Sequence, residues 1–126
     1  MSKWRALVAE DSAPVLFSLE VLLEGSGIAI VGAAATLKGI LGLAETVAAD
    51  IAILDVDLNG ELVFPAAELL IQRGVPVVFT TGFAPEKLFP ARLLGQTVLQ
   101  KPYDPDELLR LIEDAIRQAM ASRQQS

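Results

Sequence analysis

Short apolar runs alternate with longer segments of helical periodicity along the chain, and this alternation constrains the fold more than any other feature. Segments with apolar residues at helical spacing separate the runs, and neither a Pro/Gly/Ser-rich linker nor an internal repeat interrupts the pattern. Strands and helices that alternate in this way predict an α/β fold with a doubly wound parallel sheet. Five runs have the length and composition of buried strands: residues 5–9, 28–32, 51–54, 77–79 and 98–100.

Start and stop signals support the helices between these runs. Asp11 or Ser12 can cap the first helix, and Thr36 is placed to cap the second. Apolar spacing predicts a third helix over residues 64–72, and Asp104, followed by a proline, predicts the start of the last helix. These local signals fix where most of the predicted helices begin.

One segment departs from the pattern. Residues 85–89 begin like a helix, but Pro90 lacks a backbone N–H and its ring clashes with a preceding carbonyl. We therefore expect the stretch from Pro85 to Leu94 to be short, kinked or mobile.

Length and composition restrict the function. The chain has 126 residues, and we expect a single domain over residues 1–126, with its core from about 5 to 120 and no output domain. A net charge of -6 argues against nucleic-acid binding. Without cysteine or histidine, the chain cannot form a Cys/His metal site or supply a histidine general base. It shows no signal peptide and no apolar run near the ~20 residues of a membrane span, so we expect a cytoplasmic protein.

Polar side chains follow four of the five predicted strands. Glu10 and Asp11 follow the first, Asp55 the third, Thr81 the fourth and Lys101 the fifth. Because the carboxyl ends of parallel strands meet at one edge of a sheet, these groups should converge there. Neighbouring acids repel one another unless a cation neutralises them, and oxygen ligands without His or Cys suit Mg²⁺. The pattern predicts a magnesium site beside an amine and a hydroxyl, an arrangement suited to phosphoryl chemistry.

Each of these residues also has a simpler interpretation. Asp11 can act only as a helix cap, and Lys101 only as a surface residue before a turn. Asp57 is either a solvated loop acid or a residue whose backbone carbonyl faces the metal. Of the adjacent threonines, Thr80 is best explained as a strand former, whereas Thr81, next to a glycine, is the better candidate for an oxygen contact.

Taken in order and at this spacing, the strand-end motifs resemble the signature of the response-regulator receiver domain, the CheY-like family. The likeness covers about residues 5–120 and implies a five-stranded, flavodoxin-like (βα)5 receiver fold. It also implies that Asp55 is the phosphoacceptor. The motifs that carry the likeness are Glu10-Asp11, Asp55, Thr81 and Lys101-Pro102.

The resemblance implies a metal site and its ligands. Asp11 and Asp55 would bind Mg²⁺ together with the backbone carbonyl of Asp57, and Glu10 would act through water. The acids of the family pattern are present at Glu10, Asp11 and Asp55, whereas Asp57 would contribute only its backbone.

The resemblance also assigns roles around the phosphoryl group. Lys101 would pair with the phosphoryl oxygens, Thr81 would donate a hydrogen bond to them after transfer, and the Lys101-Pro102 peptide would be cis. One position departs from the family, because Val98 stands where members often have an aromatic residue three positions before the lysine. The usual coupling between the threonine and that aromatic side chain therefore cannot operate here.

The fourth strand and its end resemble a subgroup, the single-domain "FAT GUY" receivers. The stretch from Pro76 to Phe83 follows the subgroup's pattern and departs from it at Val77 and Thr80. On the first helix, Phe17 is a candidate surface for docking a kinase, whereas Leu16 is better explained by core packing.

The implied function is that of a single-domain response regulator in a two-component phosphorelay. Asp55 would accept a phosphoryl group from a partner, either a histidine kinase or a histidine phosphotransfer protein, because the chain has no histidine of its own. The phosphorylated form would change its protein binding or pass the group on. Such a protein is not an enzyme in the ordinary sense, since it catalyses only its own phosphorylation and dephosphorylation. Neither nucleic acid nor a membrane is an expected partner.

Three other classes of function fit parts of the sequence. A receiver-like module that binds partners without phosphorylation is compatible with Val98. Asp55 and Asp57 resemble the Asp-x-Asp pair of haloacid-dehalogenase-type phosphatases, but those enzymes place further acids after the nucleophile strand and usually have a longer chain. A flavin-binding, flavodoxin-like module would need a phosphate-cradling loop after the first strand, where Glu10 and Asp11 would repel a phosphate.

Overall fold

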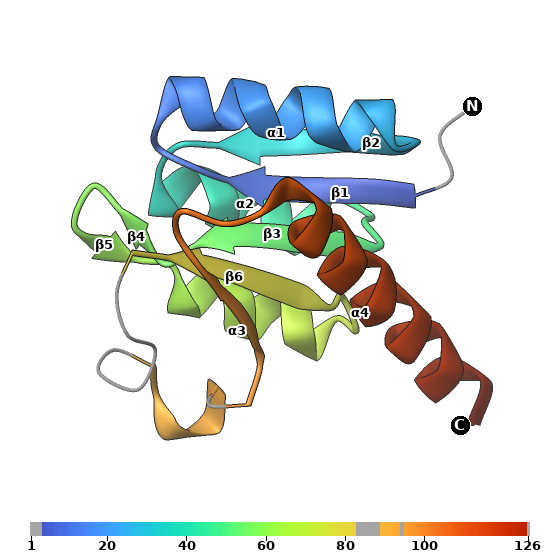
Figure 1. Ribbon diagram of the computed structural model, residues 1–126. Coiled ribbons are helices and arrows are strands. Elements are labelled where there is room, and N and C mark those ends of the chain that lie inside the picture. The colour runs from blue at the N-terminus through green and yellow to red at the C-terminus, as the bar shows by residue number, and fades with distance from the viewer. Residues whose placement is uncertain (1–3, 83–88, 94, 126) are drawn as a thin grey trace.

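A five-stranded parallel sheet forms the centre of the molecule, as the alternation of strands and helices predicts (Figure 1). The computed structural model describes residues 4–82, 89–93 and 95–125. The strand order is β2-β1-β3-β6-β7, so that β3 is central and is buried along its whole length. The strands are β1 (Trp4–Ala9), β2 (Ile28–Ala34), β3 (Ile51–Asp55), β6 (Val77–Thr81) and β7 (Thr97–Gln100).

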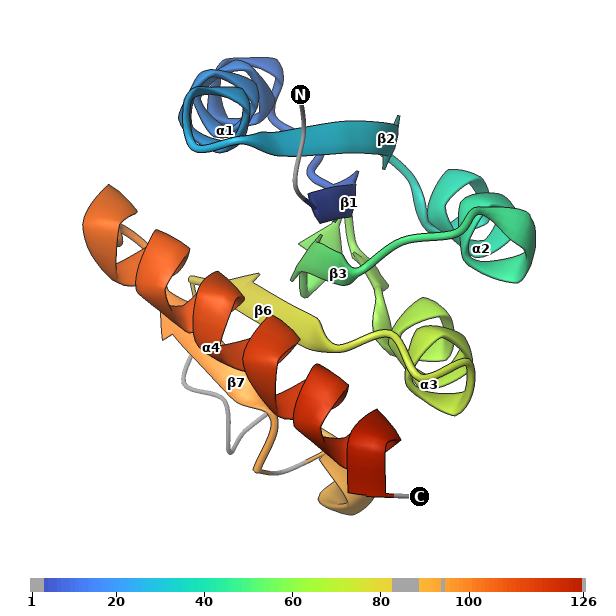
Figure 2. The same ribbon diagram turned by 90° about the vertical axis from the view of Figure 1, so that its right-hand side faces the viewer.

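Two pairs of helices cover the two faces of the sheet, as Figure 2 shows. One face packs against α1 (Ala13–Gly25) and α4 (Pro105–Gln125), and the other against α2 (Leu37–Thr46) and α3 (Phe64–Gln72). Side chains of β1 alternate between the two resulting cores: Ala6 and Val8 belong to the first, and Leu7 and Ala9 to the second. The sheet is therefore buried on both sides, which leaves its edges for functional groups.

The helices α1 and α2 begin where the local signals in the sequence predict, and the structure decides between the two possible caps of α1. Ser12 is the cap of α1, and its hydroxyl accepts a hydrogen bond of 3.5 Å from the N–H of Val15. Thr36 caps α2 in the same way, at 3.0 Å from the N–H of Gly39. Asp11, the other candidate for the cap of α1, is engaged elsewhere, since its carboxylate accepts a hydrogen bond from the N–H of Asn59.

In the residues that the structure describes, the crossover from β6 to β7 contains no α-helix. After Pro90 the chain forms only a 3₁₀ turn, η2 (Ala91–Leu93), so the described part of the fold has four α-helices rather than five. Phe89 is buried, and its ring lies 4.9 Å from the rings of Phe64 and Phe79. Residues 83–88, which include the predicted start of the fourth helix and the subgroup residue Phe83, lie outside the described residues.

A small hairpin that the sequence interpretation missed follows the central strand. Its strands are β4 (Asp57–Leu58) and β5 (Glu61–Leu62), which pair antiparallel, and it leads directly into α3. The two residues of its turn, Asn59 and Gly60, both have positive φ, 53° and 90°. An Asn-Gly pair between two short strands is the sequence signal for such a turn.

Candidate functional site

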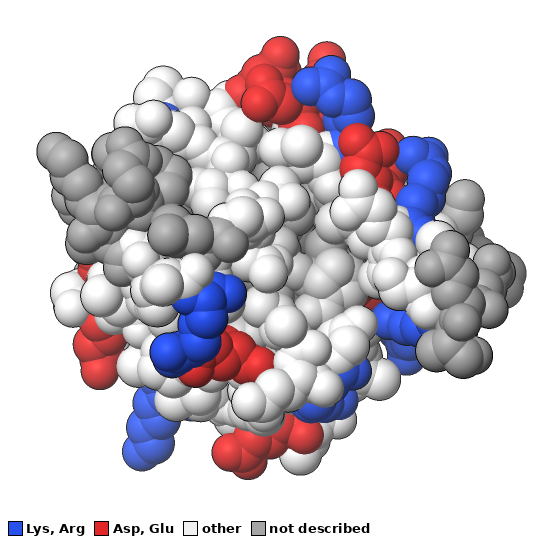
Figure 3. Space-filling view, turned by 90° about the horizontal axis from the view of Figure 1, so that it is seen from below, with Lys and Arg blue, Asp and Glu red and all other residues white. Residues whose placement is uncertain are grey.

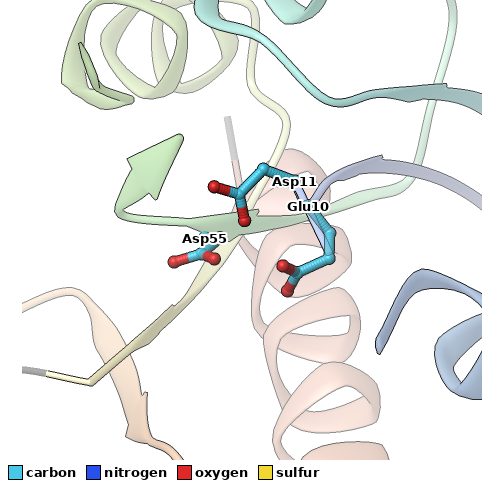
Figure 4. Close-up of side chains that lie close together, drawn as sticks. All are labelled: Glu10, Asp11 and Asp55. Carbon is cyan, nitrogen blue, oxygen red and sulfur yellow. The ribbon is translucent and has the colours of Figure 1, made fainter. Parts of the chain in front are cut away.

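Three carboxylates meet at the carboxyl edge of the sheet. Glu10 and Asp11 follow β1, and Asp55 ends β3, the neighbouring strand, in the register that pairs Ala9 with Leu54. One oxygen from each side chain lies within 4.8 Å of the others (Figure 4). The structure therefore brings together acids that are more than 40 residues apart in the sequence.

Lys101 is the cation of this cluster. Its Nζ lies 3.0 Å from Oε1 of Glu10 and 2.9 Å from Oδ2 of Asp55, while Glu10 is 2% exposed and Asp55 6% exposed. The amine thus bridges two acids that are almost completely removed from water. Lys101 is therefore no surface residue before a turn, because its charge is committed to the site.

Burial and hydrogen bonding act in opposite directions on the ionisable groups. Burial raises the pKa of Glu10 and the charge of Asp55 adds to this, although hydrogen bonds from the N–H of Ser12 and from Lys101 partly offset it. Burial alone would lower the pKa of Lys101, but its hydrogen bonds with Asp55 and Glu10 outweigh this and raise it. The amine is consequently held in its charged form.

The donor set fits a hard divalent cation. All three side chains offer carboxylate oxygens, and the chain has neither cysteine nor histidine to favour a softer metal. When Glu10 is ionised, three negative charges and the positive charge of Lys101 leave two negative charges in excess. Mg²⁺ carries the charge that balances this excess.

Asp57 turns its side chain toward the hairpin. Its Oδ1 accepts a hydrogen bond of 2.6 Å from the N–H of Gly60, and its own N–H donates to Oδ1 of Asp55 at 3.3 Å. The side chain is therefore a turn-stabilising group rather than a freely solvated loop acid. A contact of its backbone carbonyl with a metal stays a prediction.

The carboxyl ends of β6 and β7 lie side by side next to the acids. Thr80 and Thr81 are both buried at the end of β6, and an oxygen contact of Thr81 stays a prediction. The carbonyl of Thr81 accepts a hydrogen bond of 2.8 Å from the N–H of Lys101, which places this threonine beside the lysine. The Lys101-Pro102 peptide is cis, as the resemblance implies.

Two apolar grooves lie beside the site on the α1 side of the molecule. The first has a volume of about 380 Å³ and includes Phe17 and Val21, which are 67% and 59% exposed. The second, of about 500 Å³, is lined in part by Lys101. Both grooves share Ser18 and Tyr103, so they form a continuous surface from α1 to Lys101. Leu16 packs against the core, as expected.

Charged side chains on the face seen in Figure 3 do not segregate by sign. Blue Lys and Arg residues lie next to red Asp and Glu residues around a wide uncharged area. Among the ion pairs of the described residues, Arg92 pairs with Glu68 on α3. Of the helices in the described ranges, none is long and apolar enough to cross a membrane.

Asn59 is the site residue that the sequence interpretation missed. Its backbone N–H donates a hydrogen bond of 2.9 Å to Oδ2 of Asp11. The Asn-Gly pair is a signal for the turn itself, but nothing local to it indicates a contact with an acid 48 residues earlier.

Comparison with known proteins gives consistent matches. A family model described as the response regulator receiver domain matches residues 6–113. The transcriptional regulatory protein PdtaR of Mycobacterium tuberculosis is 33% identical over 115 residues, which cover 89% of this chain and 56% of PdtaR. The solution structure of SdrG from Sphingomonas melonis Fr1 is 35% identical, with a TM-score of 0.76, and the match covers 90% of this chain and 95% of SdrG.

The crystal structure of the response regulator PhyR from Brucella abortus is a further match. It is 28% identical with a TM-score of 0.82, and the match covers 98% of this chain but 51% of PhyR. The chain thus spans about half the length of PdtaR and of PhyR. None of these matches tests the "FAT GUY" subgroup, which stays a prediction. Because the family model covers most of the sequence, the chain belongs to the response regulator receiver domain family.

Proposed function

We propose that Asp55 accepts a phosphoryl group from a phosphohistidine on a partner protein, as the receiver of a two-component phosphorelay. The observation that supports this role is the setting of Asp55 at the tip of the central strand, with its Oδ2 2.9 Å from the amine of Lys101. A second carboxylate pair, Glu10 and Asp11, lies on the neighbouring strand end. The single-domain organisation and the cytoplasmic location expected from the sequence stay predictions.

The transfer needs a nucleophile and a means of holding charge. A carboxylate oxygen of Asp55 forms a bond to phosphorus as the bond between phosphorus and the imidazole nitrogen breaks, and the leaving imidazole takes up a proton. Asp55 becomes an acyl phosphate: its carboxyl group loses its own charge, and the phosphoryl oxygens bring roughly two negative charges to the same place. Lys101, held beside Asp55 by the carbonyl of Thr81, can follow that charge.

The chain's acids supply a site for the metal that the transfer requires. Glu10, Asp11 and Asp55 would hold Mg²⁺, Glu10 through water, together with the carbonyl of Asp57. When bound, the ion neutralises charge on the phosphoryl oxygens. Thr81, buried at the end of β6, would donate its hydroxyl hydrogen to those oxygens after transfer.

The two apolar grooves on the α1 side are suited to bind the partner protein that donates the phosphoryl group. An exposed phenylalanine and valine next to a groove that extends to Lys101 offer an apolar surface within reach of the phosphoacceptor. We therefore place the docking site for the histidine kinase or histidine phosphotransfer protein there. With a phosphotransfer protein that phosphorylates the wild type, Phe17→Ala should slow transfer but leave labelling by acetyl phosphate unchanged. Equal transfer rates would exclude this surface.

The direct test is intact mass spectrometry after incubation with Mg²⁺ and acetyl phosphate or phosphoramidate. The wild type should gain one phosphoryl group, and chelation of the metal should abolish the gain. Asp55→Asn should gain none, whereas Asp57→Asn, which changes a neighbouring acid, should still be labelled. No adduct on folded wild type with metal present would favour a module that binds without phosphorylation. Steady release of inorganic phosphate from a phosphate ester would instead indicate a phosphatase.

A further inference from the structure

The hairpin after β3 contacts the acid cluster through its turn. The N–H of Asn59 lies 2.9 Å from Oδ2 of Asp11, although the two residues are 48 positions apart. Asp11 follows β1 and is only half-buried, so its side chain would otherwise be free to rotate about its own bonds. This hydrogen bond therefore fixes the orientation of one carboxylate of the cluster.

The turn itself is held rigidly. Leu58 and Val63, on either side of it, are 1% and 0% exposed, and the N–H of Val63 donates to the carbonyl of Val56 at 2.9 Å. Asp57 accepts from the N–H of Gly60 at 2.6 Å, which closes the turn from inside. Positive φ at both turn positions, as a type I′ turn requires, allows the N–H of Asn59 to point away from the hairpin.

We propose that the Asn59–Gly60 turn is a positioning element for the metal site, and this inference rests on the proposed function. The N–H of Asn59 holds one oxygen of Asp11, so the other oxygen is presented to the divalent cation without loss of side-chain freedom on binding. Loss of a hydrogen bond of this kind to a ligating side chain typically costs roughly 10–100-fold in metal affinity. The affinity for Mg²⁺ thus depends on a turn whose own side chains are not ligands.

A pair of glycine variants tests this dependence. Gly60 and Gly27 both have positive φ, 90° and 81°, and a Cβ added at either would meet no atom within 4 Å. Gly27 lies between α1 and β2, at the opposite edge of the sheet from the acids. Valine at either position is strained in the backbone alone. Gly60→Val should weaken Mg²⁺ binding by about tenfold or more in calorimetric titration without phosphodonor, whereas Gly27→Val should bind Mg²⁺ as the wild type does.

Variants of Asn59 separate the backbone from the side chain. Asn59→Gly keeps the N–H and tolerates a φ of 53°, so it should retain the wild-type affinity. Asn59→Pro removes the N–H and should weaken Mg²⁺ binding as Gly60→Val does. The amide proton of Asn59 should also exchange faster with solvent in Asp11→Ala than in the wild type. Folding of every variant is checked by its urea unfolding curve.

Failure of this inference differs from failure of the proposed function. If the wild type forms the Asp55 adduct and Gly60→Val binds Mg²⁺ as tightly as Gly27→Val, the turn does not position Asp11 and only this inference is wrong. Loss of affinity in Asn59→Gly would also overturn it, because the side chain would then be the active group. If the folded wild type neither binds Mg²⁺ nor forms the adduct, the proposed function itself fails.

Discussion

Lys101→Met removes the amine that pairs with the acid cluster, while it keeps a side chain of similar length. The lost amine lies 3.0 Å from Glu10 and 2.9 Å from Asp55. At an effective dielectric constant of about 20, unit charges about 3 Å apart attract by roughly 5–6 kcal/mol, and the hydration lost on burial offsets a large part of this. Removal of one partner from a buried pair costs roughly 3–5 kcal/mol. Because the side chain of Lys101 is 27% exposed, we expect a loss of about 3 kcal/mol in the metal-free protein.

Urea unfolding followed by circular dichroism, with the metal chelated, measures this loss. Lys38→Met is the matched control, because Lys38 is exposed on α2 and should change the free energy of unfolding by no more than about 0.5 kcal/mol. In the Lys101→Met background, Glu10→Gln should recover part of the loss, since it removes one of the two facing charges. Added Mg²⁺ should stabilise Lys101→Met more than the wild type, because the variant's cluster carries one more uncompensated negative charge.

Two results would contradict this reasoning. The first is a loss in Lys101→Met no larger than in Lys38→Met, which would mean that water already compensates the carboxylates. The second is a Glu10→Gln change that destabilises Lys101→Met further. In that case the charge of Glu10 would be favourable within the fold, contrary to the burial that raises its pKa.

Three further predictions concern the core and alkaline pH. Burial raises the pKa of Tyr103, the only tyrosine in the sequence. The stability that its neutral form contributes is therefore present below about pH 10 and is lost as the pH rises through the folded-state pKa. Tyr103→Phe should flatten this loss in urea unfolding between pH 9 and 11, roughly the range of tyrosine ionisation. Phe89→Ala should cost about 3–5 kcal/mol in thermal unfolding, because its ring fills the space between two other aromatic rings. Gly32→Ala should cost about 1–3 kcal/mol, since its Cβ would lie 2.8 Å from Leu7, whereas Gly42→Ala in the open on α2 should gain up to about 1 kcal/mol. A stabilising Gly32→Ala, a neutral Phe89→Ala or an unchanged pH profile in Tyr103→Phe would each refute the corresponding packing argument.

Much of the fold is predictable from the sequence because its signals are local. The alternation of strands and helices predicts the five-stranded parallel sheet, and the helix over residues 64–72 begins and ends where its apolar spacing indicates. Thr36 caps α2 through an N–H only three residues away. Each of these features depends on neighbours within one or two turns, so composition and spacing are sufficient to identify them.

The crossover from β6 to β7 and the cap of α1 were harder to predict from the sequence. Of the segment that Pro90 was expected to interrupt, the structure describes residues 89–93, and the burial of Phe89 between two aromatic rings depends on elements far away in sequence. Asp11 and Ser12 are equally good caps in the sequence. Ser12 takes the role because a distant N–H engages the carboxylate of Asp11, which no local pattern reveals.

The sequence by itself determined which groups stand at the strand ends: acids after the first and third strands, a threonine after the fourth and a lysine after the fifth. The tertiary structure alone decided how they meet. Strand order sets Glu10 next to Asp55, the end of β7 beside β6 places Lys101 against both acids, and the hairpin turn reaches Asp11. The reason is physical. Residue type and periodicity act over a few residues, whereas distances between charges at the sheet edge follow from the register of strands that the chain joins only through long crossovers.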